Sequence, residues 1–253
     1  MPRRIWVEKH FYISLVSVAL LLALWEAGAT VMGKEIVLPG PAKVFRELVT
    51  LIQNPDFLRA LMATFLRGMA AFALSTLAGS ALGILAGLSP IAAAALAPLL
   101  TIIRATPVLA LILLALLWFP SNFVPVFSAF LMAFPVMAAN AAEGARACDP
   151  RLLEMSRLFC IPKTTIFIHL RLPSATPHLL AGARGALGLS WKVVVAGEVL
   201  SQPIHALGTG MQEARVLLET PRVFAWATAS ILLCGLTEWL FSLVTKKVFR
   251  RGI

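Results

Sequence analysis

The stretch ATFLRGMAAFALSTLAGSALGILAGLSP, residues 63–90, is apolar along nearly its whole length and contains one charged residue, Arg67. A helix needs roughly 20 mostly apolar residues to cross a bilayer, where its backbone must satisfy its own hydrogen bonds. Gly79, Gly83 and Gly87 recur at every fourth position and therefore line one face, which favours close helix packing in lipid. We expect a transmembrane helix over residues 60–88 with this glycine face against another helix.

Five more apolar runs surround this one. The 253 residues are 59% hydrophobic and 13% charged, whereas soluble domains carry about 25% charged residues. The expected spans, accurate to about three residues at each end, are 11–31, 60–88, 98–119, 123–143, 177–199 and 223–245. The fifth includes a second small-residue face around Gly185. The sequence therefore predicts an all-α integral membrane protein with six transmembrane helices.

The basic residues, which give a net charge of +10, gather at three places beside the expected spans. These are the N-terminus, the segment between spans four and five, and the C-terminal tail KKVFRRGI at 246–253. Six crossings put all three on one side, which the positive-inside rule makes cytoplasmic. The pattern follows no helix face interleaved with aromatic residues, so it does not indicate a nucleic-acid partner. We expect membrane lipids around the spans and both termini in the cytoplasm.

The segment 32–59, expected outside after the first domain at 1–31, is also basic. Within it, PAKVFRELVTLI at 41–52 has apolar residues at helical spacing, namely Val44, Phe45, Leu48, Val49 and Ile52. This pattern predicts an amphipathic helix that lies along the outer membrane interface.

A polar segment, DPRLLEMSRLFCIPKTTIFIHLRLP at 149–173, interrupts the apolar sequence. Asp149 and Pro150 are typical of a helix start. The helix would end at Cys160-Ile161-Pro162, because a residue before proline is pushed out of helical geometry. Its apolar face would contain Leu152, Leu153, Met155, Ser156 and Phe159. A second short helix, KTTIFIHL, would end at Leu172-Pro173, which gives a cytoplasmic helix-turn-helix too short and polar to span a membrane.

The spacing of this segment resembles the EAA loop of ABC importer permeases. That pattern reads Glu-Ala-Ala, three residues, Gly, nine residues, Ile, one residue, Leu-Pro. Here Glu154-Met155-Ser156 take the first triplet, Cys160 the glycine and Leu170 the isoleucine, and Leu172-Pro173 match outright. The register has no gap, although only Glu154, Leu172 and Pro173 are identical.

Further blocks extend the resemblance over nearly the whole chain after span one. In chain order they look like successive blocks of the permease branch that serves nitrate, sulfonate, taurine and related small solutes. The blocks are VLPGPAKVF (37–45), the run at 63–90, RATPVLALILLALLWF (104–119), FPVMAANAAEGAR (134–146) and LGLSWKVVVAGEVL (187–200). The resemblance implies the architecture of a type I ABC importer permease, with a core domain at 60–245 and a coupling loop at 149–173.

In such permeases the loop docks on a separate ATPase. By resemblance, Glu154, Arg157, Leu158 and Cys160 would lie at or near that contact; the alternative for each is an ordinary interfacial residue. Glycine at the turn commonly serves a left-handed conformation, which strains a cysteine. Either Cys160 is strained or Pro162 reshapes the turn, and we favour the second.

Charged residues inside spans are costly and are functional candidates. Lys192 lies deep in span five, in a block that resembles the part of the family lining the translocation path, and Glu198 follows it. A place in the path and a structural ion pair both stay open for these two residues. Arg104 is a third path candidate, although it lies near the end of its expected span and would also fit as a residue that snorkels to the headgroups.

The sequence also limits the function. It has no Gly-x-x-x-x-Gly-Lys-Ser/Thr loop, so we expect ATP to be used by partner ATPase subunits and no cofactor in this chain. The three cysteines lack paired spacing, so neither a disulfide nor a zinc site is expected. No His-Glu-x-x-His pair or Gly-x-Ser-x-Gly elbow is present and both aspartates lie outside the spans, which makes an intramembrane enzyme the distant interpretation.

These observations predict a non-enzymatic permease subunit of an ABC importer in a bacterial inner membrane. Its partners would be two ATPase subunits, a periplasmic or lipid-anchored solute-binding protein, and a second permease that is either a copy or a sister subunit. The main alternative is an ion-gradient-driven secondary transporter that uses Lys192, Glu198 and Glu238. For the solute, Lys192 hints at an anion, and heterocyclic precursors such as pyrimidines stay open.

Overall fold

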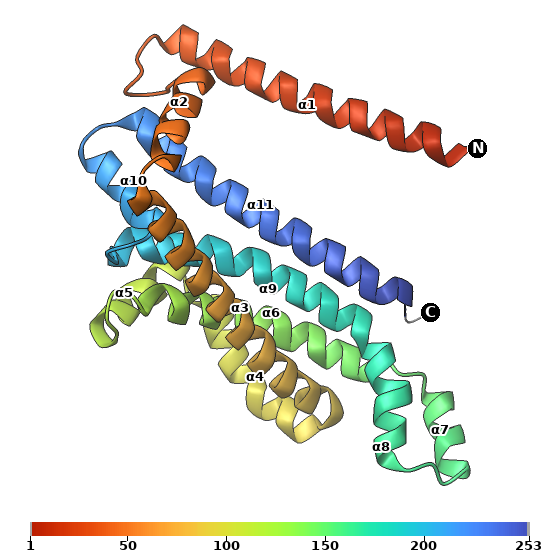
Figure 1. Cartoon of the computed structure of the whole chain (residues 1–253). Helices are drawn as coiled ribbons and strands as arrows, with labels where there is room; N and C mark the ends of the chain where they lie inside the picture. The colour runs from red at the N-terminus through yellow and green to blue at the C-terminus, as the bar shows by residue number, and fades with distance from the viewer. Residues whose placement is uncertain (1, 252–253) are drawn as a thin grey trace. The chain divides into compact units, whose positions relative to one another are not determined.

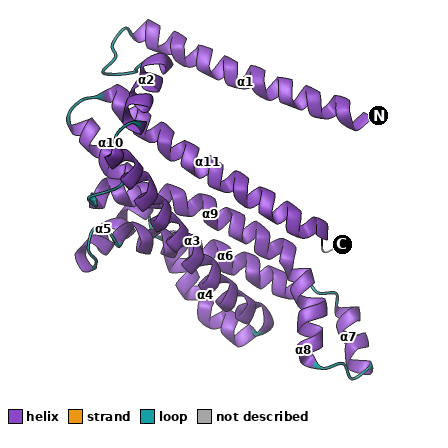
Figure 2. Ribbon diagram, in the orientation of Figure 1, coloured by secondary structure: helices purple, strands orange, loops and turns teal. Residues whose placement is uncertain are grey.

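The computed structural model describes residues 2–251, without the side chains of residues 1–11, 14 and 247–251. The described residues form helices and loops and contain no strand (Figure 2), so the predicted all-α class is confirmed. The helices are α1 Pro2–Met32, α2 Pro41–Ile52, α3 Pro55–Leu88, α4 Pro90–Ala105, α5 Val108–Trp118, α6 Val124–Arg146, α7 Pro150–Leu158, α8 Lys163–Ile166, α9 Leu172–Ser201, α10 Leu207–Val216 and α11 Thr220–Arg251. The predicted terminal segments 1–31 and 246–253 include residues 1 and 252–253, which lie outside the described part.

Among residues 2–251, five helical stretches are long and apolar enough to cross a membrane, and α4 with α5 makes a sixth if the pair is counted as one span. The prediction of one continuous helix over 98–119 is wrong, because α4 and α5 meet at an angle of 101°. Thr106 between them has an extended backbone, since Pro107 excludes the helical conformation from the residue before it. The apolar run expected as the third span therefore consists of two helices joined by a sharp bend.

The chain forms two compact units, of which the smaller combines residues 1–58 with Gly210–Ala229. In this unit the indole N–H of Trp25 donates to the carbonyl of Pro39 over 3.0 Å, and its ring stacks on Phe224. Helix α2 has the bounds expected for the amphipathic helix, but its buried residues are Val44, Leu48 and Leu51. The expected apolar positions Phe45, Val49 and Ile52 are exposed.

The larger unit contains Arg59–Thr209 and the residues from Ser230 onward. Helix α6 packs along α9, and Figure 1 shows the two running side by side toward the α7–α8 hairpin. Helix α3 approaches α6 through its glycine face. A Cβ added to Gly79 would lie 2.7 Å from Cβ of Met137, and one added to Gly87 would lie 2.6 Å from Cβ of Ala145. Contacts this short leave no room for a methyl group.

Gly185 on α9 has a looser environment, because an added Cβ there would lie 3.2 Å from a methyl carbon of Val136. That neighbour is the end of a side chain rather than backbone. All four predicted packing glycines thus lie at helix contacts. The contacts of the three glycines on α3 leave no room for a Cβ atom, whereas the contact of Gly185 on α9 is with a side chain that can move.

Replacement of Gly83 by alanine tests the α3–α6 contact. The added methyl carbon would lie 2.7 Å from Cβ of Ala141, so overpacking should destabilise the protein by about 1–3 kcal/mol. Gly235→Ala on α11 is the matched control, because nothing lies within 4 Å of an added Cβ there. We expect the melting temperature of the purified protein to fall for Gly83→Ala and to stay or rise for Gly235→Ala. Equal melting temperatures would contradict the packing argument.

Candidate functional site

Helix α7 begins and ends with well-defined caps. The Asp149 carboxylate accepts a hydrogen bond from the N–H of Arg151 over 2.9 Å, and Pro150 is the first helical residue. At the other end, the N–H of Ile161 donates to the carbonyl of Ser156 over 3.0 Å and the N–H of Cys160 to that of Arg157 over 3.1 Å. These two bonds form a Schellman motif, which fixes the end of α7.

Cys160 occupies the position of this motif that glycine usually takes, with a φ of +53°. Our expectation that Pro162 would reshape the turn and spare Cys160 this conformation is therefore wrong. The reason is that both capping hydrogen bonds require a left-handed residue after the cap. Pro162 instead follows the turn and directly precedes α8.

The surface of the hairpin formed by α7 and α8 is the second feature of this region. Of the expected apolar face only Ser156 is buried, and Leu158 and Phe159 expose 83% and 74% of their surface. Glu154 and Arg157 are exposed on the same helix. Large apolar side chains surrounded by charges are typical of a surface that another protein covers.

The predicted end of the second short helix at Leu172-Pro173 is wrong, because one helical stretch continues from Lys163 to Ser201. Pro173 has no N–H and breaks the regular α-helical ladder. A π turn at Phe167–Arg171 precedes it, in which the N–H of Leu172 donates to the carbonyl of Phe167. The wider turn accommodates the proline, so the hairpin is continuous with α9.

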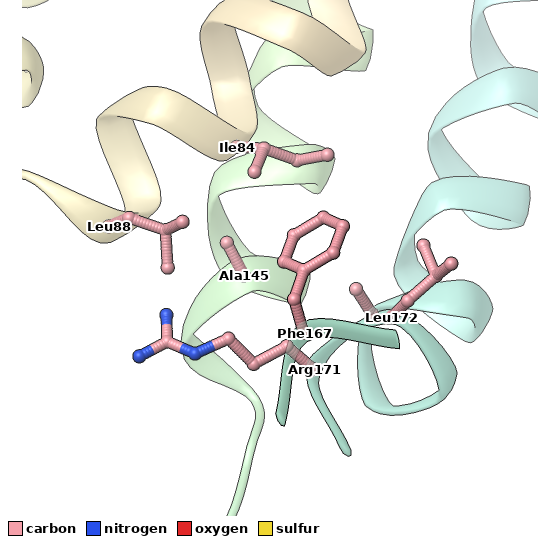
Figure 3. Close-up of a pocket in the computed structure, with 7 residues that line it drawn as sticks. Ile84, Leu88, Ala145, Phe167, Arg171 and Leu172 are labelled. Carbon is pink, nitrogen blue, oxygen red and sulfur yellow. The ribbon is translucent and has the colours of Figure 1, made fainter. Parts of the chain in front are cut away.

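Phe167 in the π turn joins the hairpin to two other helices. It borders a cavity of about 10 Å³ together with Ile84 and Leu88 of α3 and Ala145 of α6. Figure 3 shows its ring among these side chains, with Leu172 on the other side. Phe167 therefore lies where the hairpin meets α3 and α6.

A buried polar cluster lies elsewhere in the same unit. The side chain of Glu198 is completely buried and pairs with the guanidinium of Arg67 over 2.9 Å. It also accepts from the Thr64 hydroxyl over 3.0 Å and from the N–H of Gly208 over 3.2 Å. Glu198 thus forms an ion pair with Arg67 on α3, whereas Lys192 is exposed on α9. A place of either residue in the path stays a prediction.

Arg67 extends this cluster to two loops. Its guanidinium donates to the carbonyl of His205 over 2.8 Å and to the side-chain oxygen of Asn122 over 2.9 Å. Asn122 lies between α5 and α6, and His205 between α9 and α10. We call Thr64, Arg67, Asn122, Glu198 and Gly208 the Glu198 cluster. Its hydrogen bonds connect two loops to α3. In the sequence, the only sign of this cluster was the presence of Arg67 and Glu198 within expected spans.

Arg104, the third path candidate, is exposed near the end of α4. Its guanidinium donates to the carbonyl of Pro135 on α6 over 2.9 Å. It borders a groove of about 290 Å³ that Glu143 and Arg146 also line. The structure therefore separates the three candidates by environment: Glu198 is buried in its cluster, Arg104 lines a groove, and Lys192 is exposed.

The described residues contain no group of three or more His, Cys, Asp or Glu side chains that would hold a metal ion. The cysteines are free thiols, with Cys148 buried and Cys160 exposed.

Comparison with known proteins identifies the family. Residues 79–250 match the model of the binding-protein-dependent transport system inner membrane component. The chain belongs to this family. The predicted resemblance to ABC importer permeases of the nitrate, sulfonate and taurine type is confirmed.

Three relatives illustrate the range of this permease family. A probable ABC transporter permease protein of Brucella melitensis is 30% identical over 75% of this chain and 77% of its own length. The riboflavin transport system permease protein of Chloroflexus aurantiacus is 30% identical over 93% of this chain and 88% of its own. The taurine transport system permease protein of Escherichia coli is 28% identical over 92% and 86%. This permease is thus a multi-pass inner-membrane transport component.

Substitution of Cys160 tests the turn of the permease hairpin. Cys160→Gly should stabilise the protein slightly. The substitution removes the cost of a left-handed L-residue, about 1–2 kcal/mol, but about half of this gain is lost because glycine makes the unfolded chain more flexible. Cys160→Val should destabilise it, since a β-branched residue fits this conformation poorly. The melting temperatures should rank Gly above Cys above Val, and the reverse order would contradict the assigned turn.

A double-mutant cycle on Arg67 and Glu198 tests the cluster. Either Arg67→Met or Glu198→Met leaves a buried charge unpaired, which should cost about 3–5 kcal/mol. The double variant should be more stable than the sum of the single losses predicts. Arg222→Ala, which breaks the exposed pair with Glu219, should cost no more than about 1 kcal/mol. Additive losses in unfolding measurements would show that the two residues do not interact.

Proposed function

We propose that this permease is the membrane subunit of an ATP-driven importer for a small solute such as a sulfonate, taurine or nitrate. It is not itself the ATPase. The observation that carries the proposal is a helical hairpin whose tip exposes Leu158 and Phe159 and whose second helix is continuous with α9. Such a projection is suited to receive motion from another subunit.

In this mechanism the hairpin tip docks in a groove of a cytoplasmic ATPase subunit. Leu158 and Phe159 would be buried there, with Glu154 and Arg157 at the charged rim of the contact. When two ATPase subunits close on ATP, the docked hairpins move with them. The π turn and Phe167 then pass the displacement to α3, α6 and α9, which changes the side from which the path is open.

The proposed orientation follows from the basic residues of the sequence. With the hairpin in the cytoplasm, both termini are cytoplasmic and α2 lies on the external side. A solute-binding protein would deliver its cargo at that external side, and a second permease subunit would complete the path. The relatives named for taurine and riboflavin transport support a small organic or inorganic solute.

The ion-gradient alternative would require titratable groups that exchange protons during transport. Glu198, its best-placed candidate, is fixed by a guanidinium, a hydroxyl and a backbone N–H. Because these three partners hold the carboxylate in one place, Glu198 is better suited to a structural role than to proton exchange, which favours the ATP-driven mechanism.

Charge reversal on the hairpin tests the docking. Variants Glu154→Lys and Arg157→Glu, each in the permease co-expressed with its ATPase subunits, should lower ATP hydrolysis by the purified complex at least about tenfold, because like charges would meet across the contact. The amount of co-purified ATPase should fall with it. Arg46→Glu on the exposed surface of α2 is the matched control and should leave both unchanged. Full hydrolysis in both hairpin variants would make the proposed docking wrong.

A further inference from the structure

The groove beside Arg104 is built from two helix faces. On α4 its lining residues recur at helical spacing and end with Ala97, Thr101 and Arg104. On α6 the lining runs from Phe134 to Arg146 with the same periodicity. Its volume of about 290 Å³ is at the lower end of the range for ligand pockets. The size suits a small solute rather than a large cofactor.

Small residues create this space. Gly83 and Ala86 of α3 border it, and alanines form much of the lining from α4 and α6. Ile103 of α4 forms a buried apolar cluster with Phe134 and Ala138 of α6, so α4 packs against α6 beside the groove. The groove is therefore a property of packed helices and not of a loop.

The depth of Arg104 makes it unusual. Its bonding partner Pro135 lies eleven residues before Arg146 at the end of α6, which corresponds to about 16 Å along the helix. That is near the middle of a hydrocarbon core of about 30 Å if Arg146 marks the headgroup level. An exposed guanidinium at this depth is costly in lipid, so the groove has to face water or protein.

The charges of the groove favour an anion. Arg104 and Arg146 are opposed by Glu143 alone, which leaves a net charge of +1 along the lining. Arg104 has one hydrogen bond in the described part of the chain, to Pro135, and a guanidinium has five N–H groups. The remaining donors match the paired oxygens of a carboxylate, sulfonate, nitrate or phosphate group.

We propose that this groove is a subsite of the translocation path that binds a small oxyanion, with Arg104 as the residue that recognises it. The inference rests on the proposed transport function and adds the class of solute and its place. Glu143 near the end of α6 would then weaken binding of the anion as it moves from Arg104 toward Arg146, which favours release. Glycine and alanine in the lining let the solute pass close to the helix backbones.

Thiol labelling tests the site without knowledge of the natural solute. The assembled transporter, with Cys148→Ala, Cys160→Gly and Cys234→Ala as background, receives Thr101→Cys in the groove, one turn from Arg104. It is reacted in phosphatidylcholine nanodiscs with an anionic (sulfonatoethyl) or a cationic (trimethylammonioethyl) methanethiosulfonate. We expect the anionic reagent to react faster relative to the cationic one by about tenfold, owing to the nearby charge. Arg104→Gln should abolish this preference and Arg104→Lys should keep it.

Leu99→Cys is the matched control, because Leu99 is exposed on α4 but does not line the groove; it should react slowly with both reagents. Methanesulfonate, nitrate or inorganic phosphate at millimolar concentration should protect Thr101→Cys. If Thr101→Cys reacts as slowly as the control, the groove is covered by lipid or protein and the proposal fails. A preference that is the same in Arg104→Gln would also overturn it.

Anionic lipid headgroups share the chemistry of these solutes, so a second set of nanodiscs contains phosphatidylglycerol. Protection by this lipid without protection by any of the three soluble anions would assign the groove to lipid and overturn the solute subsite. The labelling requires neither ATP nor hairpin docking. A negative result here would therefore leave the ATPase docking intact, and failure of the hairpin variants would leave this site standing.

Discussion

The close approach of α3 to α6 is the constraint on which most of the larger unit depends. Lipid supplies no hydrophobic drive for helices to associate, so their contact relies on van der Waals packing. The glycine face of α3 gives that packing, since added Cβ atoms at Gly79 and Gly87 would lie 2.7 and 2.6 Å from α6 side-chain atoms. The same contact sets where the neighbouring side chains of α3 lie. Gly83 and Ala86 border the Arg104 groove, and Ile84 and Leu88 border a small cavity together with Phe167.

The Glu198 cluster fixes a different part of α3. A buried carboxylate needs full compensation, and here the partners come from α3 and from the start of α10. Arg67 adds bonds to loops that the chain places 55 and 138 residues away. Helix α3 is thus held by polar bonds near Arg67 and by apolar packing beyond Gly79. Two kinds of attachment along one helix leave little freedom for it to shift alone.

The sequence predicted those features of the fold that depend on a local pattern of residues. Apolar runs located the spans, the glycine row marked the face of α3 that meets α6, and Asp149-Pro150 marked the start of α7. Features that depend on long-range geometry were missed. Nothing local connects Arg67 with Glu198, which lie 131 residues apart. The π turn compensates for Pro173 in a helix that the sequence pattern ended there, and the left-handed Cys160 follows from capping bonds that outweigh residue preference.

The bend between α4 and α5 is an intermediate case, because Pro107 stands in the sequence but the sharp bend beside it was not predicted. A proline inside an apolar run of membrane length is compatible with a kinked helix, and only the surrounding packing decides how sharp the bend is. Here the bend ends α4 shortly after Arg104, and α4 lines the Arg104 groove together with residues 134–146 of α6. Without the bend, α5 would continue the direction of α4 beyond Arg104 instead of turning away at Thr106.

Together these contacts connect the hairpin with the groove through α3. Phe167 borders the same small cavity as Ile84 and Leu88, and these two residues lie within one helical turn of Gly83 and Ala86 on the groove side. Because packed helix contacts shift between discrete arrangements rather than stretch, a hairpin displacement that moves this end of α3 has to change the lining of the groove. The small residues that permit close packing are also the ones with the least side-chain bulk to obstruct such a shift. Coupling and solute passage would then depend on the same few turns of one helix.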